Sequence, residues 1–373
     1  MRTIRRLLRE FLLRMPGRWG ETFLLPWVRR VYDQLPFLDF RVTRYAASEA
    51  KHIRSYIANG GQEYAIVYDF EAIGSLSYAT LINMILIARY MIAHEVFTRM
   101  FIVSPECRSG NDQMDNDEYE DRVLEFVRIS ETLLDEDRSA TKVISAMEFS
   151  AMIDATEKKS ILFSEFSSVR RPFFRDCFNV FNNLMAKQSN SVRSDVLLSF
   201  DDFAEYLPEK FVSKKYITWH CRFASIDPGR QTESEEFLEC YRYLRERFQH
   251  HEIVIVSDTV GCQHYMDLAQ SLEIKDVEFS KDVSPDFLGD SALIMRSDFF
   301  FWFRGGGIDT VPRASMMAYE MFGPLMNEVF WRKNCHLTSW QSDEQKFVVL
   351  DKHQFVDNRA LDLKKIGCSW NTD

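Results

Sequence analysis

The stretch "DFFFWFRGGGIDTVPRASMMAYEMFG" occupies residues 298–323 and combines the local patterns that decide the fold. Its first six residues form an aromatic run that is typical of a buried strand. Three glycines follow, and glycine lets the backbone turn with positive φ or pass close to another group. The pattern over about 312–322 predicts a helix, with a proline suited to its first turn. We expect strand, turn and helix in that order, with glycines that serve either the turn alone or a ligand.

The same alternation extends through the second half of the chain. "KYITWHCR", "EIVIVSD" and "DVEFS" each read as a strand, and a predicted helix follows each one. Alternating strands and helices indicate a parallel sheet covered by helices. The expected strands are 215–222, 252–258 and 276–280, and the expected helices are 234–248, 261–272 and 285–295.

The first half begins with another strand, helix and strand. "YAIVYDF" predicts a buried strand, a mostly apolar stretch predicts a long helix, and "FTRMFIVSP" predicts the next strand. This order implies parallel pairing with a right-handed crossover. The expected elements are strands at 64–70, 97–105, near 141–145 and near 160–164, a polar loop at 108–121, and helices at 73–95, 119–136 and 172–185.

A chain of 373 residues exceeds the usual size of a single hydrophobic core, so two domains are expected. The pattern loosens between residues 187 and 215, where we place the boundary. We predict an α/β protein with two Rossmann-like, doubly wound domains that face a cleft. The predicted units are a basic amphipathic segment at 1–35, an N-terminal acceptor domain at 36–200, and a C-terminal donor domain with an extension at 201–373.

The seven cysteines are scattered and form no CxxC pair, which fits neither a disulfide framework nor a zinc site. A reducing compartment is therefore expected. The sequence shows no membrane-spanning run and no signal peptide, so we expect a cytoplasmic location. The net charge of −10 argues against a nucleic-acid partner, because nucleic-acid phosphates require a basic surface.

One basic segment departs from this acidic balance. Residues 1–30 contain eight arginines interleaved with leucine, phenylalanine and tryptophan. Such a segment suits an amphipathic helix lying on anionic lipid, which would place the protein at the inner face of the cell membrane. The alternative, a helix packed on its own domain with its arginines in water, stays open.

Polar residues gather where the strands of the second half end. In open parallel sheets, ligands bind at the carboxyl ends of the strands. Each of these residues also has a structural interpretation: glycines make turns, strand-end arginines form ion pairs, and Asp258 can cap a helix. Together, they favour a nucleotide diphosphate held by backbone amides and arginine. The candidate donor-binding residues are His220, Arg222, Ser257, Asp258, Arg304, Gly305, Gly306, Gly307 and Thr310.

The strand-end motifs resemble those of a known enzyme family. "ITWHCRF" resembles the H-x-R motif of fucosyltransferase-like GT-B glycosyltransferases, and "VIVSD" resembles their second donor-site strand. The stretch from residue 290 to 320 is similar to their third donor-site region. "DFEAIGSLSYATLI" looks, more faintly, like their first strand-to-helix turn. The main similarity covers about 215–320.

The resemblance implies a nucleotide-sugar donor on the C-terminal domain, with GDP as one candidate carrier, and an acceptor on the N-terminal domain. It implies no obligatory metal or other cofactor, and it makes Arg222 the contact for the donor diphosphate. This chain departs from the family at Phe223, where a second arginine is frequent, and at the glycines, where serine or threonine is frequent. These departures weaken the expectation of a fucose donor more than that of glycosyl transfer.

Catalysis would require neutralisation of the leaving diphosphate, for which Arg222 is the candidate, and a base for the acceptor hydroxyl. Asp69 and Glu71 follow the first strand and are the candidate bases, although a helix cap and a solvated charge explain them equally well. "DND" at 115–117 has the D-x-D form of a metal site, but it lies in a hydrophilic run, so we reject it.

These observations predict a metal-independent glycosyltransferase, of hexosyl or deoxyhexosyl type, that acts on a cell-surface glycan or lipid-linked saccharide in polysaccharide biosynthesis. The main alternative is a non-catalytic, membrane-associated glycan-assembly protein with a degenerate GT-B fold. A Rossmann oxidoreductase is weakened by the absence of G-x-G-x-x-G from the sequence.

Overall fold

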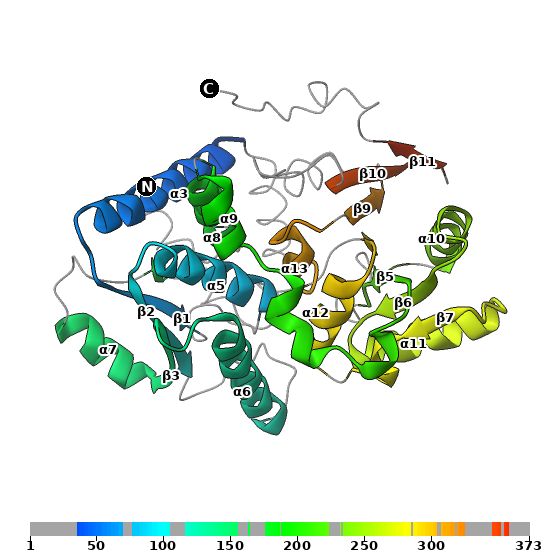
Figure 1. Ribbon diagram of the computed structural model, residues 1–373, viewed down its shortest axis with the longest axis horizontal. Coiled ribbons are helices and arrows are strands. Elements are labelled where there is room, and N and C mark those ends of the chain that lie inside the picture. Colours follow the sequence, from blue (N-terminus) through cyan, green and yellow to red (C-terminus); the bar gives the residue numbers. More distant parts are fainter. Residues whose placement is uncertain are drawn as a thin grey trace, which may run out of the picture.

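The computed structural model shows two α/β halves, each built on its own sheet (Figure 1). The structure describes residues 36–69, 77–104, 116–155, 163–164, 176–186, 188–223, 232, 234–284, 286–303, 307–317, 319–324, 345–351 and 354–357.

The first sheet has the strand order β3-β2-β1-β4, and all its pairs are parallel. The central strand β1 pairs from Glu63 opposite Phe97 to Asp69 opposite Val103. Its apolar run "YAIVY" suits this central position, where both faces are covered. The strands are β1 (Glu63–Asp69), β2 (Phe97–Ser104), β3 (Ser139–Ser145) and β4 (Phe163–Ser164).

Helix α5 (Tyr78–Ile92) is the most buried helix of the first half. The side chain of Ser77 caps its start by accepting the N–H of Thr80. Every residue from Thr80 to Ala88 is buried, as expected for a helix that is apolar on all sides. Burial of each Leu, Ile or Met side chain of α5 stabilises the folded state by about 1.5–3 kcal/mol.

The other helices described in the first half lie around its sheet and around α5 (Figure 1). The sequence patterns predicted α6 and α8, and they missed α3 and α7. The side chain of Arg54 on α3 donates to the carbonyl of Asn183 on α8 over 2.8 Å, which ties the two helices together. These other helices are α3 (Pro36–Ala58), α6 (Asn116–Leu133), α7 (Ala146–Ala155) and α8 (Asp176–Met185).

In the described part of the chain, the second sheet has seven strands in the order β11-β10-β9-β8-β5-β6-β7. All pairs are parallel except the edge pair β10 and β11. Strand β5 lies between β8 and β6. The strands are β5 (Tyr216–Cys221), β6 (Glu252–Val256), β7 (Val277–Phe279), β8 (Phe300–Phe303), β9 (Tyr319–Pro324), β10 (Gln345–Asp351) and β11 (Gln354–Asp357).

Helices cover both faces of this sheet. On one face, Trp219 stacks on Phe237, with 4.6 Å between the ring centroids, in a core formed with α10 and α11. On the other face, the hydroxyl of Tyr216 donates to the carbonyl of Leu293 on α12 over 2.9 Å. Because side chains alternate along a strand, His220 lies on the α12 face of β5. The helices are α10 (Ser234–Arg247), α11 (Thr259–Ser271), η5 (Ser280–Asp282), α12 (Phe287–Arg296) and α13 (Thr310–Arg313).

The segment between the sheets is folded onto the first half by Arg89 of α5. Its guanidinium donates to the carboxylate of Asp202 over 2.6 Å and to the carbonyls of Leu133, Asp195 and Leu197. The domain boundary predicted at residues 200–201 falls in this segment and stays a prediction. The segment contains α9 (Asn190–Val196), η2 (Phe200–Tyr206) and η3 (Glu209–Phe211).

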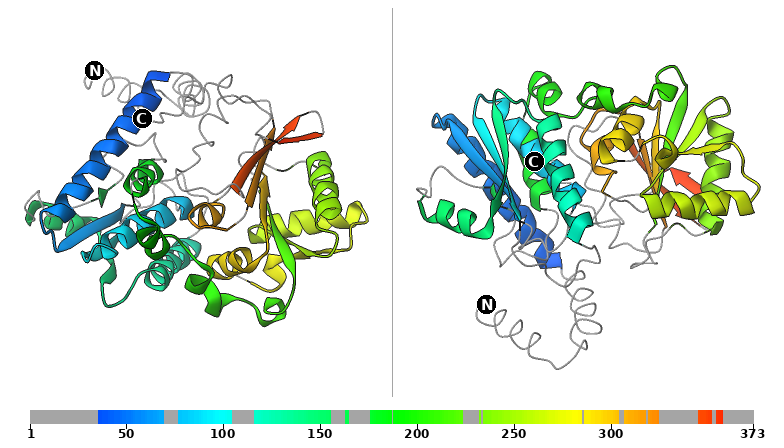
Figure 2. Two further views of the ribbon diagram at one scale, coloured as in Figure 1. Left: turned by 45° about the horizontal axis from the view of Figure 1, so that its top comes forward. Right: turned by 90° about the horizontal axis from the view of Figure 1, so that it is seen from below.

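The two halves meet directly, and Figure 2 shows α5 and α13 where they approach each other. One continuous core contains Ile82 and Leu86 from α5 together with Ile308 and Val311 from the second half. The two parallel sheets and their covering helices confirm the predicted α/β fold with two Rossmann-like halves. The cleft between them stays a prediction.

The helix predicted over residues 312–322 is wrong. The structure has one helical turn, α13, and then strand β9, which pairs in parallel with β8 and β10. The hydroxyl of Ser315 donates to the carbonyl of Pro312 over 2.8 Å and accepts the N–H of Met317, which turns the chain away from a helical path. Sheet pairing then overrides the helix propensity of the Met-rich run.

Among the helices that the structure describes, none combines the length and the apolar character needed to cross a bilayer. The basic amphipathic segment predicted at residues 1–35 lies outside the described residues. Its interaction with a membrane surface therefore stays a prediction.

Candidate functional site

The candidate donor site lies where β5, β6, β7 and β8 end. These four strands are neighbours in the sheet and run parallel, so their carboxyl ends share one edge. Most of the predicted donor-site residues are at or just after these ends. Ligands of open α/β sheets bind at this edge.

His220 is buried at this edge and hydrogen-bonded to the neighbouring strand. It is 6% exposed, and its Nδ1 lies 2.9 Å from the carbonyl oxygen of Val256 at the end of β6. Because a carbonyl only accepts, Nδ1 carries the proton, and Nε2 of the neutral ring is an acceptor. Burial lowers the pKa of His220 to about 4, so the ring is neutral at pH 7.

The second ring nitrogen of His220 lacks a hydrogen-bond partner in the described part of the chain. A buried polar atom without a partner costs free energy comparable to a lost hydrogen bond. Arg222 is two residues beyond His220, directly after the end of β5, and its positive charge contributes to the lowered pKa of His220. A buried acceptor and a cationic residue thus both belong to the end of β5.

The backbone of Arg222 is held in place from the α11 side. Its carbonyl accepts the hydroxyl of Tyr265 over 2.5 Å and the N–H of Thr232 over 3.2 Å. The Arg222 side chain itself is half-buried. The strand end that carries the predicted diphosphate contact is therefore fixed by hydrogen bonds.

Ser257 and Asp258 both have structural roles at the end of β6. The hydroxyl of Ser257 donates to the carbonyl of Cys221 over 2.8 Å. Asp258 caps α11 by accepting the N–H of Gly261 over 2.6 Å. A Cβ on Gly261, in the first turn of α11, would lie 2.1 Å from the Ser257 hydroxyl, so a larger residue there would displace Ser257. Helix capping by Asp258, one of the two interpretations of this residue, is thus observed, and contact with a ligand stays a prediction.

Gly307 and Thr310 are the described members of the glycine turn. A Cβ on Gly307 would lie 3.1 Å from Cβ of Tyr78 at the start of α5. Close approach of the first half therefore accounts for this glycine without a ligand. Thr310 is buried and begins α13, which spans only Thr310–Arg313. One turn of helix has little dipole, so the predicted anion site at its start loses that support.

Four predicted site residues lie outside the described residues: Arg304, Gly305, Gly306 and Glu71. Asp69 is the last residue of β1, at the carboxyl edge of the first sheet. The structure gives no side-chain placement for it, so both candidate bases stay predictions. The "DND" run leads into the first turn of α6, which begins at Asn116. Among the residues that the structure describes, no three His, Cys, Asp or Glu side chains could hold a metal ion together.

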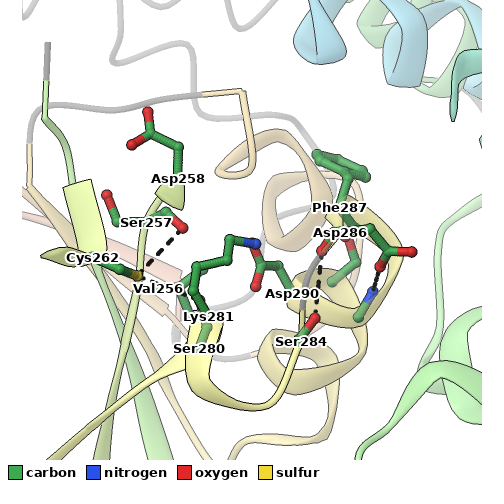
Figure 3. Close-up of polar contacts among 12 residues, drawn as sticks. Val256, Ser257, Asp258, Cys262, Ser280, Lys281, Ser284, Asp286, Phe287 and Asp290 are labelled. Atoms are coloured by element: carbon green, nitrogen blue, oxygen red, sulfur yellow. Dashed lines mark hydrogen bonds and ion pairs between the residues drawn. The ribbon is translucent and has the colours of Figure 1, made fainter. Parts of the chain in front are cut away.

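The structure adds a buried ion pair that the sequence patterns missed. Lys281 of η5 donates to Asp290 of α12 over 2.6 Å, and the two side chains are 14% and 8% exposed (Figure 3). Burial raises the pKa of Asp290 to about 6 despite the nearby ammonium. Its Oδ1 has no hydrogen-bond partner among the described residues. The available signal was an isolated charge in the apolar run "FLGDSALIM".

Comparison with known proteins leaves the family open. No protein-family model matches the chain, and no curated protein matches it significantly. Solved structures match weakly. Escherichia coli ADP-heptose LPS heptosyltransferase II is 10% identical with a TM-score of 0.40, covering 77% of this chain and 89% of that one.

Two further structures match at a lower level. The UDP complex of Staphylococcus aureus MnaA is 10% identical with a TM-score of 0.33, covering 70% of this chain and 79% of that one. A protein from Listeria monocytogenes described as a putative UDP-N-acetylglucosamine 2-epimerase is 11% identical with a TM-score of 0.32. The match covers 69% of this chain and 78% of that one. Similarity at this level does not assign a function to this chain.

Proposed function

We propose that this protein is a glycosyltransferase that moves a sugar from a nucleotide-sugar donor to a saccharide or lipid-linked acceptor. The donor would bind at the carboxyl edge of the second sheet, and the acceptor would bind on the first half. The reaction would not require a metal. GDP is one candidate carrier, and a hexose or deoxyhexose is the candidate sugar.

The observation that carries this proposal is the buried His220 ring with its unpartnered Nε2 at the end of β5, the strand that Arg222 directly follows. The neutral ring offers an unpartnered acceptor at Nε2, to which a ligand hydroxyl or N–H group could donate. The neighbouring guanidinium can bind a diphosphate through paired hydrogen bonds. A nucleotide sugar supplies both of these groups, and the sequence resemblance around "HCR" points to the same ligand class.

The roles of the remaining residues follow from this placement. Arg222 would neutralise charge on the leaving diphosphate, with Arg304 as a second candidate. Amides of Gly305, Gly306 and Gly307 would add hydrogen bonds, although the tight packing of Gly307 already explains that glycine. Asp69 or Glu71 would accept the proton of the acceptor hydroxyl.

We also propose that residues 1–30 hold the protein at the inner face of the cell membrane. Their arginines and bulky apolar side chains suit an anionic lipid surface. A lipid-linked or growing surface saccharide would then be close to the first half.

A thermal-shift screen tests the donor class. GDP, UDP, ADP, CMP and their sugar conjugates would each be added to the wild-type protein, with Mg²⁺ or with EDTA. A ligand that binds the folded state stabilises it by about 2.7 kcal/mol at one hundred times its dissociation constant. The same screen on Arg222→Ala tests the diphosphate contact. Arg242→Ala is the matched control, because Arg242 is 63% exposed on α10 and pairs with Glu239.

We expect one nucleotide to raise the melting temperature in EDTA as well as in Mg²⁺. This shift should persist in Arg242→Ala and disappear in Arg222→Ala. If every nucleotide leaves the melting temperature unchanged at millimolar concentration, the transferase proposal fails and the assembly-protein alternative is favoured.

A further inference from the structure

Tyr78 occupies the point where the carboxyl edges of the two sheets meet. It is the first residue of α5, in the connection that follows β1 of the first sheet. Its ring stacks on Phe287, the first residue of α12, with 4.4 Å between centroids and 5° between planes. Phe287 follows β7 and η5 of the second sheet. An aromatic pair therefore bridges the two halves.

The hydroxyl of Tyr78 joins a polar chain across the same boundary. It donates to Oε2 of Glu125 and accepts from the guanidinium of Arg122, both on α6. The other oxygen of Glu125 accepts the backbone N–H of Phe287 over 3.2 Å. Burial raises the pKa of Tyr78, which keeps the phenol protonated as the donor. Hydroxyl, carboxylate and backbone amide thus connect α5, α6 and α12.

The backbone of Tyr78 is equally constrained. Gly307 approaches so closely that an added Cβ would lie 3.1 Å from Cβ of Tyr78. The exposed ion pair between Arg128 and Asp286, 2.8 Å apart, lies at the same boundary, and surface pairs of this kind contribute little. Tyr78 therefore contacts Phe287 at the start of α12 and Gly307, which follow β7 and β8 of the second sheet.

We propose that Tyr78, acting through Glu125 and Phe287, is an interdomain clamp that sets the relative position of the two sheet edges. Tyr78 is in this sense a positioning residue. The catalytic consequence rests on the proposed function: a donor on the second sheet and an acceptor on the first react only when held at the correct distance, and small displacements cost large factors in rate.

Hydrogen–deuterium exchange tests the clamp without any ligand. Tyr78→Phe removes the hydroxyl and keeps the ring, and Tyr56→Phe is the matched control, because the Tyr56 hydroxyl bonds to the carbonyl of Glu63 within the first half. We expect Tyr78→Phe to speed exchange at residues 287–289 at least fivefold. Exchange in β5 and β6 should not change, and Tyr56→Phe should leave residues 287–289 unaffected.

A double variant tests whether Tyr78 acts through Glu125. Glu125→Ala removes the acceptor of the Phe287 amide, and it should speed the same exchange. If the clamp is correct, Tyr78→Phe/Glu125→Ala exchanges no faster at residues 287–289 than Glu125→Ala alone. The clamp would be overturned if the exchange rate at residues 287–289 in the double variant rose by the product of the two single-variant increases. It would also be overturned if Tyr78→Phe changed exchange only within α5.

Kinetics then separate the clamp from the proposed function. With a nucleotide sugar that binds, Tyr78→Phe should lower kcat at least tenfold and leave the donor KM within twofold. A donor KM that rises while kcat is unchanged would refute the positioning role. If no nucleotide sugar binds the wild type, the proposed function fails, and the exchange data still decide whether the clamp exists.

Discussion

His220 shows how burial can turn a titratable residue into a neutral acceptor. Its Nδ1 is committed to the carbonyl of Val256, and its pKa is lowered to about 4. In the unfolded chain the pKa is near 6.5, so between these values the unfolded state binds a proton that the folded state does not. His220 therefore destabilises the fold as the pH falls from about 6.5 towards 4, by at most about 3.4 kcal/mol.

Asp290 has the opposite sign over an overlapping range. Its pKa is raised from 3.8 to about 6, so the folded state binds a proton between these values that the unfolded state does not. The stability that Asp290 contributes to the fold is therefore fully present below about pH 3.8, and it is lost as the pH rises through about 6. The effects of His220 and Asp290 partly cancel in the wild-type protein.

Single variants should reveal the two effects separately. We predict that Asp290→Asn loses more stability than the wild type between pH 7 and pH 5, because the opposing effect of Asp290 is then removed and that of His220 remains. We predict that His220→Asn loses less than the wild type over the same range. Urea unfolding at pH 7 and at pH 5 gives the change in the free energy of unfolding of each protein between the two pH values. Identical changes in the wild type and both variants would contradict the pKa shifts of His220 and Asp290.

The Lys281 and Asp290 pair gives a second prediction at the residue scale. Lys281→Met leaves a carboxylate of 8% side-chain exposure without its cation, which should cost about 3–5 kcal/mol. Lys281→Met/Asp290→Leu removes both charges and should recover most of that loss. Urea unfolding at pH 7 checks both, and a Lys281→Met variant within 1 kcal/mol of the wild type would rule out a structural role for the pair.

At the scale of elements, Arg89 of α5 makes several hydrogen bonds to the segment between the sheets. Arg89→Met would leave the carboxylate of Asp202 and three backbone carbonyls without their donor. We predict a loss of about 2–4 kcal/mol, because the partners are partly buried and lose a charged donor. Arg242→Met, with a 63% exposed side chain, should change stability by less than about 0.5 kcal/mol. Equal losses in the two variants would contradict this role for Arg89.

The sequence predicted those elements in which local pattern and final environment agree. The run "YAIVYD" became β1, and "YITWHC" became the fully buried β5, because apolar strands of this kind suit the centre of a parallel sheet. The predicted helix at 312–322 failed because its residues are helix-prone locally and are paired in the sheet as β9. Local propensity cannot anticipate a neighbour that is distant in sequence, such as β10.

The candidate site was predictable in position and less so in detail. Strand ends placed His220 and Arg222 on one edge, because parallel strands bring their carboxyl ends together. The single unpartnered nitrogen of His220 required atomic contacts to find. The packing of Gly307 against Tyr78 is a contact between the two halves, and nothing in the local sequence reveals it.

At the scale of the whole molecule, the two halves share a core and are joined at the edge where the candidate donor site lies. Tyr78 and Phe287 connect the starts of α5 and α12, and α13 packs between α5 and the second sheet. A bound donor and acceptor would meet beside this junction. The geometry of the junction therefore bears directly on the proposed transfer.

The most direct test is the release of nucleoside diphosphate from nucleotide sugars in EDTA, measured by liquid chromatography with membrane glycolipids as acceptors. Wild-type protein and Arg242→Ala should release the diphosphate from one donor, and Arg222→Ala should be at least one hundredfold slower while keeping its fold. Release that is equally fast in Arg222→Ala, or no release from any donor by the wild type, would contradict a transferase centred on the end of β5.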